Sequence, residues 1–120
     1  LFVSSFILGN NIINVKKIGD SFMSCLGELN SSRLLNNKSI KKMSISPKSI
    51  SIKKSESGNA KVISKEFLGE FLIYKVSIND NILRVRTNIN NLLNNGDKCL
   101  LSLNKNSYCF LYPGAYKVSI

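Results

Sequence analysis

The chain has 120 residues, 43% of them hydrophobic, and this size suits one domain whose core needs no disulfide or metal for stability. Seventeen basic residues against seven acidic residues give a net charge of +10, which attracts nucleic acid, anionic membranes or acidic partners. Histidine is absent, which excludes Ser-His-Asp and Cys-His nucleophile systems and argues against a Cys/His metal site.

The beginning of the chain indicates a piece of a longer protein. Because the first residue is Leu1 and not methionine, we expect a fragment cut at a domain boundary. The apolar run Leu1–Leu8 is broken by two serines, is too short to span a bilayer and lacks the basic flank of a signal peptide. We therefore expect the domain itself to be soluble.

Two strands are predicted in the first quarter of the chain. Asn11–Ile18 ends at Gly19–Asp20, and Ser21–Leu26 ends at Gly27. Glycine permits the positive φ that a tight turn needs. Residues 28–40 are polar, and we expect irregular structure there.

A short helical turn is predicted after the next strand. The strand is Lys42–Ser46, which alternates polar and apolar residues. Ser46 can cap one helical turn with Pro47 at its first position, where a missing N–H costs nothing. Residues 53–59 have the composition of a loop.

The clearest pattern is a hairpin in the middle of the chain. Ala60–Leu68 is a predicted strand, followed by Phe71–Ile78 and Ile82–Thr87, which flank a turn at Asn79–Asn81.

The second arm of this hairpin has a period of two. Leu83, Val85 and Thr87 alternate with Arg84 and Arg86. This pattern predicts one buried face and one face in water.

Two further strands complete the prediction. Lys98–Leu103 follows a turn at Asn94–Asp97, and Cys109–Leu111 follows a turn at Asn104–Ser107. About eight short strands without helical periodicity indicate an all-β fold. We predict a single domain over residues 1–120, a small antiparallel OB-like barrel with at most one or two short helical turns.

The motifs of catalysis are missing. The sequence contains neither a P-loop nor a dinucleotide-binding glycine motif. Glu66 and Glu70 flank a turn and are expected to face solvent rather than form a catalytic pair. The three cysteines, Cys25, Cys99 and Cys109, have no metal-binding spacing and suit a reducing cytosol as small apolar residues. We expect no catalytic residue, metal or cofactor in this chain.

A cluster of cations is the candidate binding site. Arg84 and Arg86 share one strand face, and Lys75 is expected opposite them on the hairpin. Together they are suited to phosphate, carboxylate or nucleic acid. The simpler interpretation, which we favour, is a polar outer face.

Single-stranded nucleic acid is a weaker candidate ligand. Base stacking needs exposed aromatic rings beside basic residues. Most aromatic residues here fall in apolar runs such as Phe67–Leu68 and Tyr108–Leu111, which favours core packing. The basic residues are scattered, with no run longer than two. We therefore expect no nucleic-acid partner.

Four segments, in order, carry a resemblance to a known family. They are Phe6–Ile13, Met43–Ile50, Ala60–Tyr74 with its central Glu-Phe-Leu-Gly, and Gly96–Leu103. Together they resemble the TOBE-type regulatory domain at the C-terminus of the ATP-binding subunits of ABC importers. The matching types take up sugars, spermidine and putrescine, ferric iron, or sulfate and molybdate.

The sequence departs from the family pattern in two places. An arginine-proline-glutamate segment of the family stands here as Ser46-Pro47-Lys48, so its charges are lost or reversed. Leu8 is inserted before Gly9 in the opening segment. Contacts that the family makes through the missing charges are therefore in question, and Ser46 and Lys48 become candidate anion or partner contacts in their place.

The resemblance implies a regulatory and dimerisation domain without chemistry of its own. Residues 1–10 would leave an N-terminal ATPase domain that binds Mg-ATP and is absent from this chain. The implied partners are that ATPase domain, a second copy of the subunit and, through the ATPase domain, membrane permease subunits. The implied location is the cytoplasm, at the inner face of the cell membrane.

Two other functions remain open at this point. One is a free-standing domain that binds a small oxyanion such as molybdate. The other is a single-stranded nucleic-acid binder, which only the charge and the fold class support.

Overall fold

The computed structural model describes residues 9–30 and 39–120 as an antiparallel all-β structure, which confirms the predicted fold class. The predicted exit segment, residues 1–10, lies outside the described residues except for Gly9 and Asn10. The described elements are β1 (Asn11–Asn14), β2 (Lys16–Ile18), β3 (Ser21–Ser24), β4 (Gly27–Asn30), β5 (Lys42–Ile45), the 3₁₀ turn η2 (Pro47–Ser49), β6 (Ile50–Lys54), β7 (Ala60–Phe67), β8 (Phe71–Ile78), β9 (Asn81–Asn88), β10 (Lys98–Leu103), β11 (Tyr108–Tyr112) and β12 (Tyr116–Ser119).

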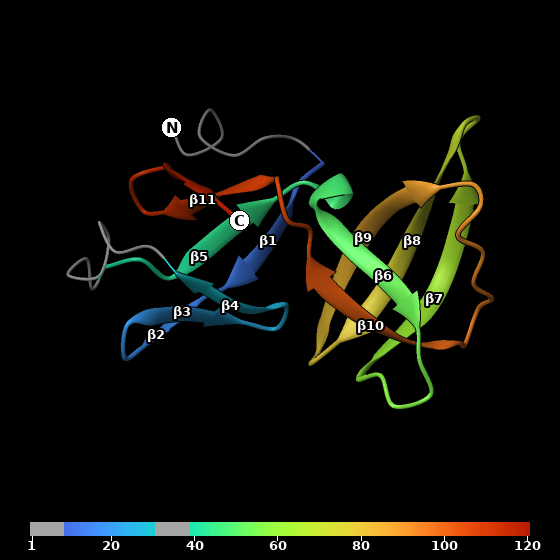
Figure 1. Ribbon diagram of the computed structural model, residues 1–120, viewed down its shortest axis with the longest axis horizontal. Coiled ribbons are helices and arrows are strands. Elements are labelled where there is room, and N and C mark those ends of the chain that lie inside the picture. The colour runs from blue at the N-terminus through green and yellow to red at the C-terminus, as the bar shows by residue number, and fades with distance from the viewer. Residues whose placement is uncertain (1–8, 31–38) are drawn as a thin grey trace.

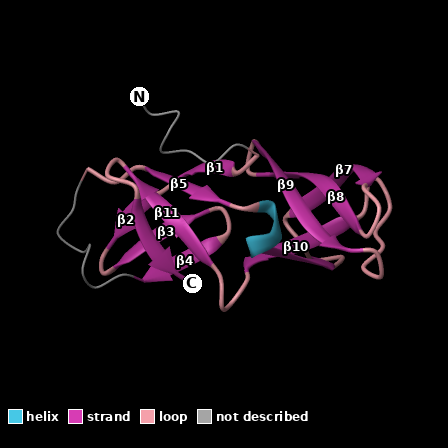
Figure 2. Ribbon diagram, turned by 90° about the horizontal axis from the view of Figure 1, so that it is seen from above, coloured by secondary structure: helices cyan, strands magenta, loops and turns pink. Residues whose placement is uncertain are grey.

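The strands form two groups that lie side by side (Figure 1). One group holds the sheet β1-β5-β11-β12 and the small sheet β2-β3-β4, and the other holds the sheet β6-β10-β7-β8-β9. The chain builds β1 to β5, crosses to build β6 to β10, and returns for β11 and β12. The η2 turn lies at the outgoing crossing, between the two groups (Figure 2).

The five-stranded sheet curls into an open, barrel-like shape. Its two edge strands, β6 and β9, approach each other without a hydrogen-bonded ladder between them. The side-chain amide of Asn91 donates to the Ile52 carbonyl at 3.1 Å and helps to hold this gap. An irregularity between Val62 and Ser64 adds the local twist that such curling needs. The sheet is consistent with the small OB-like barrel that we predicted.

Buried side chains from both groups form one continuous core. Met43 and Leu111 contribute from the first group, and Tyr74 and Val85 from the second, each at most 1% exposed. Burying such side chains is the main favourable term for a domain of this size.

The predicted alternation on the second hairpin arm is confirmed. Leu83 and Val85 are buried, whereas Arg84 and Arg86 are exposed. Thr87 is the last residue on the face that Leu83 and Val85 bury, and it is only half-buried because it lies near the end of the strand.

The prediction of one strand over Asn11–Ile18 is wrong. The segment divides at Val15 into β1, which pairs with β5, and β2, which pairs with β3. The Val15 amide donates to the Lys41 carbonyl at 2.9 Å, and its side chain is buried. The core therefore captures Val15 at the point where the chain changes sheet.

Three strands were not predicted, namely β4, β6 and β12. β4 opposes β3 and buries Leu29 beside Phe22, although residues 28–40 lack a local strand pattern. β6 extends to Lys54, into the predicted loop 53–59, because it pairs with β10 along its whole length. β12 pairs with β11 after the Pro113–Gly114 turn. Each strand exists because a partner strand satisfies its backbone.

The turn of the main hairpin has two residues and not three. Asn79 and Asp80 have φ values of +46° and +63°, and Ile78 pairs directly with Asn81. Two residues with positive φ match the twist of antiparallel strands, and asparagine and aspartate tolerate that conformation.

The hydroxyl of Tyr74 anchors the long connection between β9 and β10. It accepts a hydrogen bond from the Leu93 amide at 2.7 Å and donates to the Asn91 carbonyl at 2.8 Å. Both Tyr74 and Leu93 are buried. A segment without secondary structure thus obtains partners for its backbone inside the protein.

We expect Tyr74→Phe to lower the free energy of unfolding by about 1–3 kcal/mol, because it leaves the buried Leu93 amide without an acceptor. The matched control is Tyr116→Phe, because the Tyr116 hydroxyl has no hydrogen-bond partner among the described residues. That control should change stability by less than about 0.5 kcal/mol. Urea melts measure both, and equal effects would contradict the anchoring role of Tyr74.

Candidate functional site

Four of the five predicted site residues line one open groove. Ser46 and Lys48 reach it from the η2 turn, and Arg84 and Arg86 from the outer face of β9. The groove has a volume of about 420 Å³. It is completed by Gly9, Asn10, Pro47, Leu68, Phe71 and Ile73.

Lys75, the fifth predicted residue, lies beside the groove rather than in it. It pairs directly with Arg84 across the β8–β9 ladder, as predicted. Directly opposed side chains have Cβ atoms about 5 Å apart. Lys75 lines a neighbouring hollow of about 340 Å³ that also contains Arg84 and Glu66.

The guanidinium of Arg86 is held against an aromatic ring. Its Cζ lies 3.7 Å from the centroid of Phe71, which is a cation–π contact. This contact covers one face of the Phe71 ring and fixes the position of the Arg86 charge above the groove.

The lining of the groove carries positive charge only, while two carboxylates, Glu66 and Glu70, line hollows beside it. No aspartate or glutamate is among its lining residues. In the described part of the chain the one ion pair joins Lys54 and Asp97, at 3.9 Å. Lys48, Arg84 and Arg86 therefore form no ion pair within the described residues and give the groove a positively charged lining.

The η2 turn positions Lys48 as the sequence predicted. The Ser46 hydroxyl accepts from the Lys48 amide at 3.4 Å, and the Ser49 amide donates to the Ser46 carbonyl at 2.9 Å. Pro47 occupies the first position of the turn.

Asn11 fixes the position of Arg84, and sequence reasoning missed it. The Asn11 side-chain amide donates to the Arg84 carbonyl at 2.8 Å, and the Arg84 amide donates to the Asn11 side-chain oxygen, also at 2.8 Å. The side chain thus takes the place of a neighbouring strand along the edge of β9. In the sequence, Asn11 was distinguished only by its place in Phe6–Ile13, the opening segment of the family resemblance.

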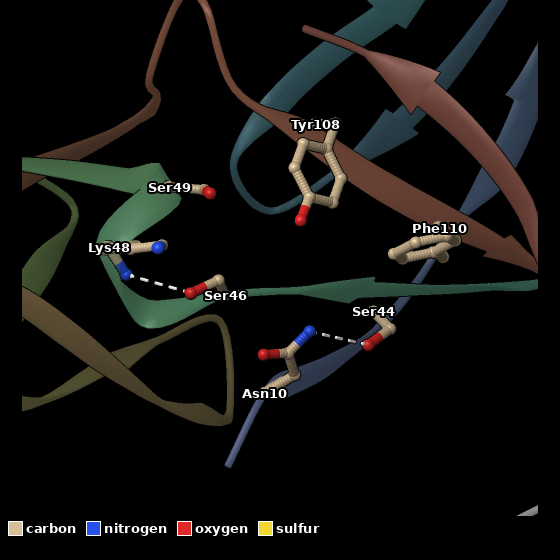
Figure 3. Close-up of a pocket in the computed structure, with 7 residues that line it drawn as sticks. All are labelled: Asn10, Ser44, Ser46, Lys48, Ser49, Tyr108 and Phe110. Atoms are coloured by element: carbon tan, nitrogen blue, oxygen red, sulfur yellow. Dashed lines mark hydrogen bonds between the residues drawn. The ribbon is translucent and has the colours of Figure 1, made fainter. Parts of the chain in front are cut away.

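A smaller pocket adjoins the groove at η2 (Figure 3). It has a volume of about 240 Å³ and shares Asn10, Ser46 and Lys48 with the groove. In Figure 3 the Tyr108 hydroxyl points into it, toward the side formed by Ser46 and Ser49. Tyr108 was missed as a site residue because β11 reaches this place only by returning to the first sheet.

Two aromatic residues that we assigned to the core are exposed. Phe67 is 55% exposed and Tyr108 is 47% exposed. Residues 66–70 are all exposed because the end of β7 and its turn extend past the core. Each exposed ring has a cation near its face, with Lys65 Nζ 5.8 Å from the Phe67 centroid and Lys117 Nζ 4.4 Å from that of Tyr108.

The acidic residues and cysteines of the described segments do not gather in one place. Glu66 and Glu70 are both exposed, as predicted. Among residues 9–30 and 39–120 no three histidine, cysteine or acidic side chains gather to hold a metal ion. Burial raises the pKa of the Cys109 thiol to about 12, and burial with the charge of Asp97 raises the pKa of Cys99.

Comparison with protein families and curated proteins identified no match. The sequence matches no protein-family model and no curated protein. Across the described residues no helix has the length and apolar character needed to cross a membrane.

We expect Asn11→Ala to reduce the free energy of unfolding by about 1–3 kcal/mol, because the Arg84 amide and carbonyl lose their partners. Asn11→Asp should destabilise as well, since a carboxylate cannot donate to the Arg84 carbonyl. Asn14→Ala is the control, because Asn14 is an exposed residue of the same strand and the hydrogen bond that its side chain accepts from Lys42 Nζ is also exposed. It should cost less than about 0.5 kcal/mol in the same urea melts. If Asn14→Ala lowered the free energy of unfolding as much as Asn11→Ala does, the stabilising role of the two Asn11–Arg84 hydrogen bonds would be refuted.

The cysteines should differ in reactivity toward iodoacetamide at about pH 8, because only the thiolate reacts. A raised pKa keeps the thiol protonated until the pH approaches that pKa. Cys109 should therefore react last, and half-buried Cys25 first. Mass spectrometry of the labelled peptides measures the rates, and concentrated urea should make them similar. If Cys25 and Cys109 reacted at equal rates in the folded protein, the deeper burial of Cys109 would be contradicted.

Proposed function

We propose that the chain is the C-terminal regulatory and dimerisation domain of the ATP-binding subunit of an ABC importer, without chemistry of its own. The observation that carries the proposal is the convergence of three of the four segments behind the family resemblance. Gly9 and Asn10, the segment Ser46–Lys48, and Leu68 are far apart in the sequence, yet all line the same groove. An accidental likeness gives no reason for such segments to share one surface.

The glycines of the resembling segments support the same proposal. Gly69 and Gly96 have φ values of +77° and +90°, a conformation that favours glycine. At the second turn, the Asp97 carboxylate accepts from the Asn94 amide at 2.8 Å. Gly69 thus lies in the turn after β7, and Gly96 lies in the turn before β10. In both turns the backbone conformation gives a structural reason for the glycine.

In this proposal an N-terminal ATPase domain binds and hydrolyses Mg-ATP, and the present domain pairs with its counterpart in a second subunit. The complete subunit would lie in the cytoplasm, bound to permease subunits at the inner face of the membrane. Lys48, where the family has glutamate, would give this surface a different charge preference.

The positive charges of Lys48, Arg84 and Arg86 favour a second candidate, a free-standing domain that binds a small oxyanion such as molybdate. Nucleic acid is less favoured, because the exposed rings of Phe67 and Tyr108 are not among the residues that line the groove, and Arg86 covers a face of Phe71, the one aromatic residue that is.

The test uses antibodies raised against the chain in cells that contain its gene. They should detect a membrane-associated polypeptide larger than the 13.4 kDa of this chain. Material captured on the antibodies should hydrolyse ATP, whereas the chain alone should not, because it lacks a phosphate-binding loop. Antibodies blocked with the purified chain are the control. A 13.4 kDa polypeptide without ATPase activity would reject the importer assignment and favour the oxyanion binder.

A further inference from the structure

The groove between η2 and the β8–β9 hairpin carries three cations that form no ion pair in the described ranges, and they outnumber the two carboxylates, Glu66 and Glu70, in the hollows beside it. We propose that this groove binds an extended acidic segment of a partner protein, with carboxylates at alternate positions. The inference concerns the groove alone and holds whether or not the chain belongs to an importer.

The spacing of the cations matches an extended peptide. Arg84 and Arg86 lie two residues apart on the exposed face of β9. Alternate residues of a strand are separated by about 6.8 Å, and alternate side chains of an extended peptide have the same spacing. Two acidic residues at positions i and i+2 therefore reach the two guanidinium groups together, and each guanidinium can hold a carboxylate with two hydrogen bonds.

The groove becomes apolar at one end, which sets a direction for the ligand. Arg86 pairs with Ile73 and stacks on Phe71, and Leu68, 41% exposed, lies in the same groove. A residue at position i+4 of the ligand would contact Leu68 and Phe71. The recognised pattern is therefore acidic-x-acidic-x-apolar, with Lys48 on the opposite wall as a further contact.

The Arg86 guanidinium, and the backbone that carries the other two cations, are held in place before any ligand arrives. The Phe71 ring holds Arg86, the Asn11 amide holds the backbone of Arg84, and Ser46 caps the turn that carries Lys48. Binding then loses less side-chain entropy than it would with free lysines and arginines.

Two other occupants fit these observations less well. A second copy of the chain offers this groove only seven acidic residues against seventeen basic ones, which makes it a poorer match for the three cations than an acidic segment. Single-stranded nucleic acid would need free aromatic faces, and the face of Phe71 in the groove is covered by Arg86.

The experiment measures fluorescence anisotropy of a labelled peptide with the order Gly-Glu-Gly-Glu-Gly-Leu-Gly as the whole chain is titrated in. Arg84→Ala and Arg86→Ala should each weaken binding by about tenfold, the effect of losing one charge-assisted contact. Lys53→Ala removes the same charge from an exposed site on β6 and should change binding by less than about twofold. Circular dichroism establishes that the three variants remain folded.

Peptide controls test the pattern itself. A peptide with glutamine in place of both glutamates should lose binding, and one with adjacent glutamates should bind more weakly. Equal weakening by Lys53→Ala and Arg84→Ala would overturn the proposal, since binding would then follow net charge alone. Failure of the peptide to bind at protein concentrations up to about 1 mM would overturn it too.

Competitors identify the other classes of ligand. Tighter binding of oligothymidylate, also weakened by Arg84→Ala, would assign the groove to nucleic acid. Displacement of the peptide by molybdate or phosphate at lower concentrations than by free glutamate-containing peptide would assign it to a small oxyanion. Either result overturns the acidic-segment proposal, and neither depends on the presence of an ATPase domain.

Discussion

The side chain of Asn11, together with the shared core, holds the two groups of strands against each other. Its amide forms two hydrogen bonds with the backbone of Arg84, 73 residues away, and so joins the first strand of one group to an edge strand of the other. The edge of a sheet carries unpaired backbone groups that must find partners. Here a carboxamide supplies both a donor and an acceptor in the geometry of a peptide group, which fixes where β9 lies relative to β1.

A second constraint comes from the path of the chain, which leaves the first sheet after β5 and returns at β11. The two crossings are tied together, because the Asn104 amide donates to the Ser49 carbonyl at 2.8 Å. The five-stranded sheet therefore stands as an insertion within the four-stranded one. The η2 turn lies where the crossings meet, which places Lys48 over the outer face of the β8–β9 hairpin.

This arrangement explains why a polar strand face becomes one wall of a groove. On a solitary hairpin, Arg84 and Arg86 would be solvated charges of little consequence. The η2 turn adds a third cation and a wall, and Phe71 orders one of the guanidinium groups. Charge that is concentrated and held in place attracts a partner more strongly than the same charge scattered over a surface.

Local patterns alone determined the all-β class, the bounds of β8 and β10, the two faces of β9 and the capped turn at Pro47, because these depend on neighbours within a few residues. They also determined that Lys75 and Arg84 share one face. The tertiary structure alone decided the role of Asn11, the strands β4 and β12, and the meeting of Lys48 with the arginines. Each of these requires partners distant in the sequence, and the period of a single segment contains no information about which distant strand will satisfy its backbone.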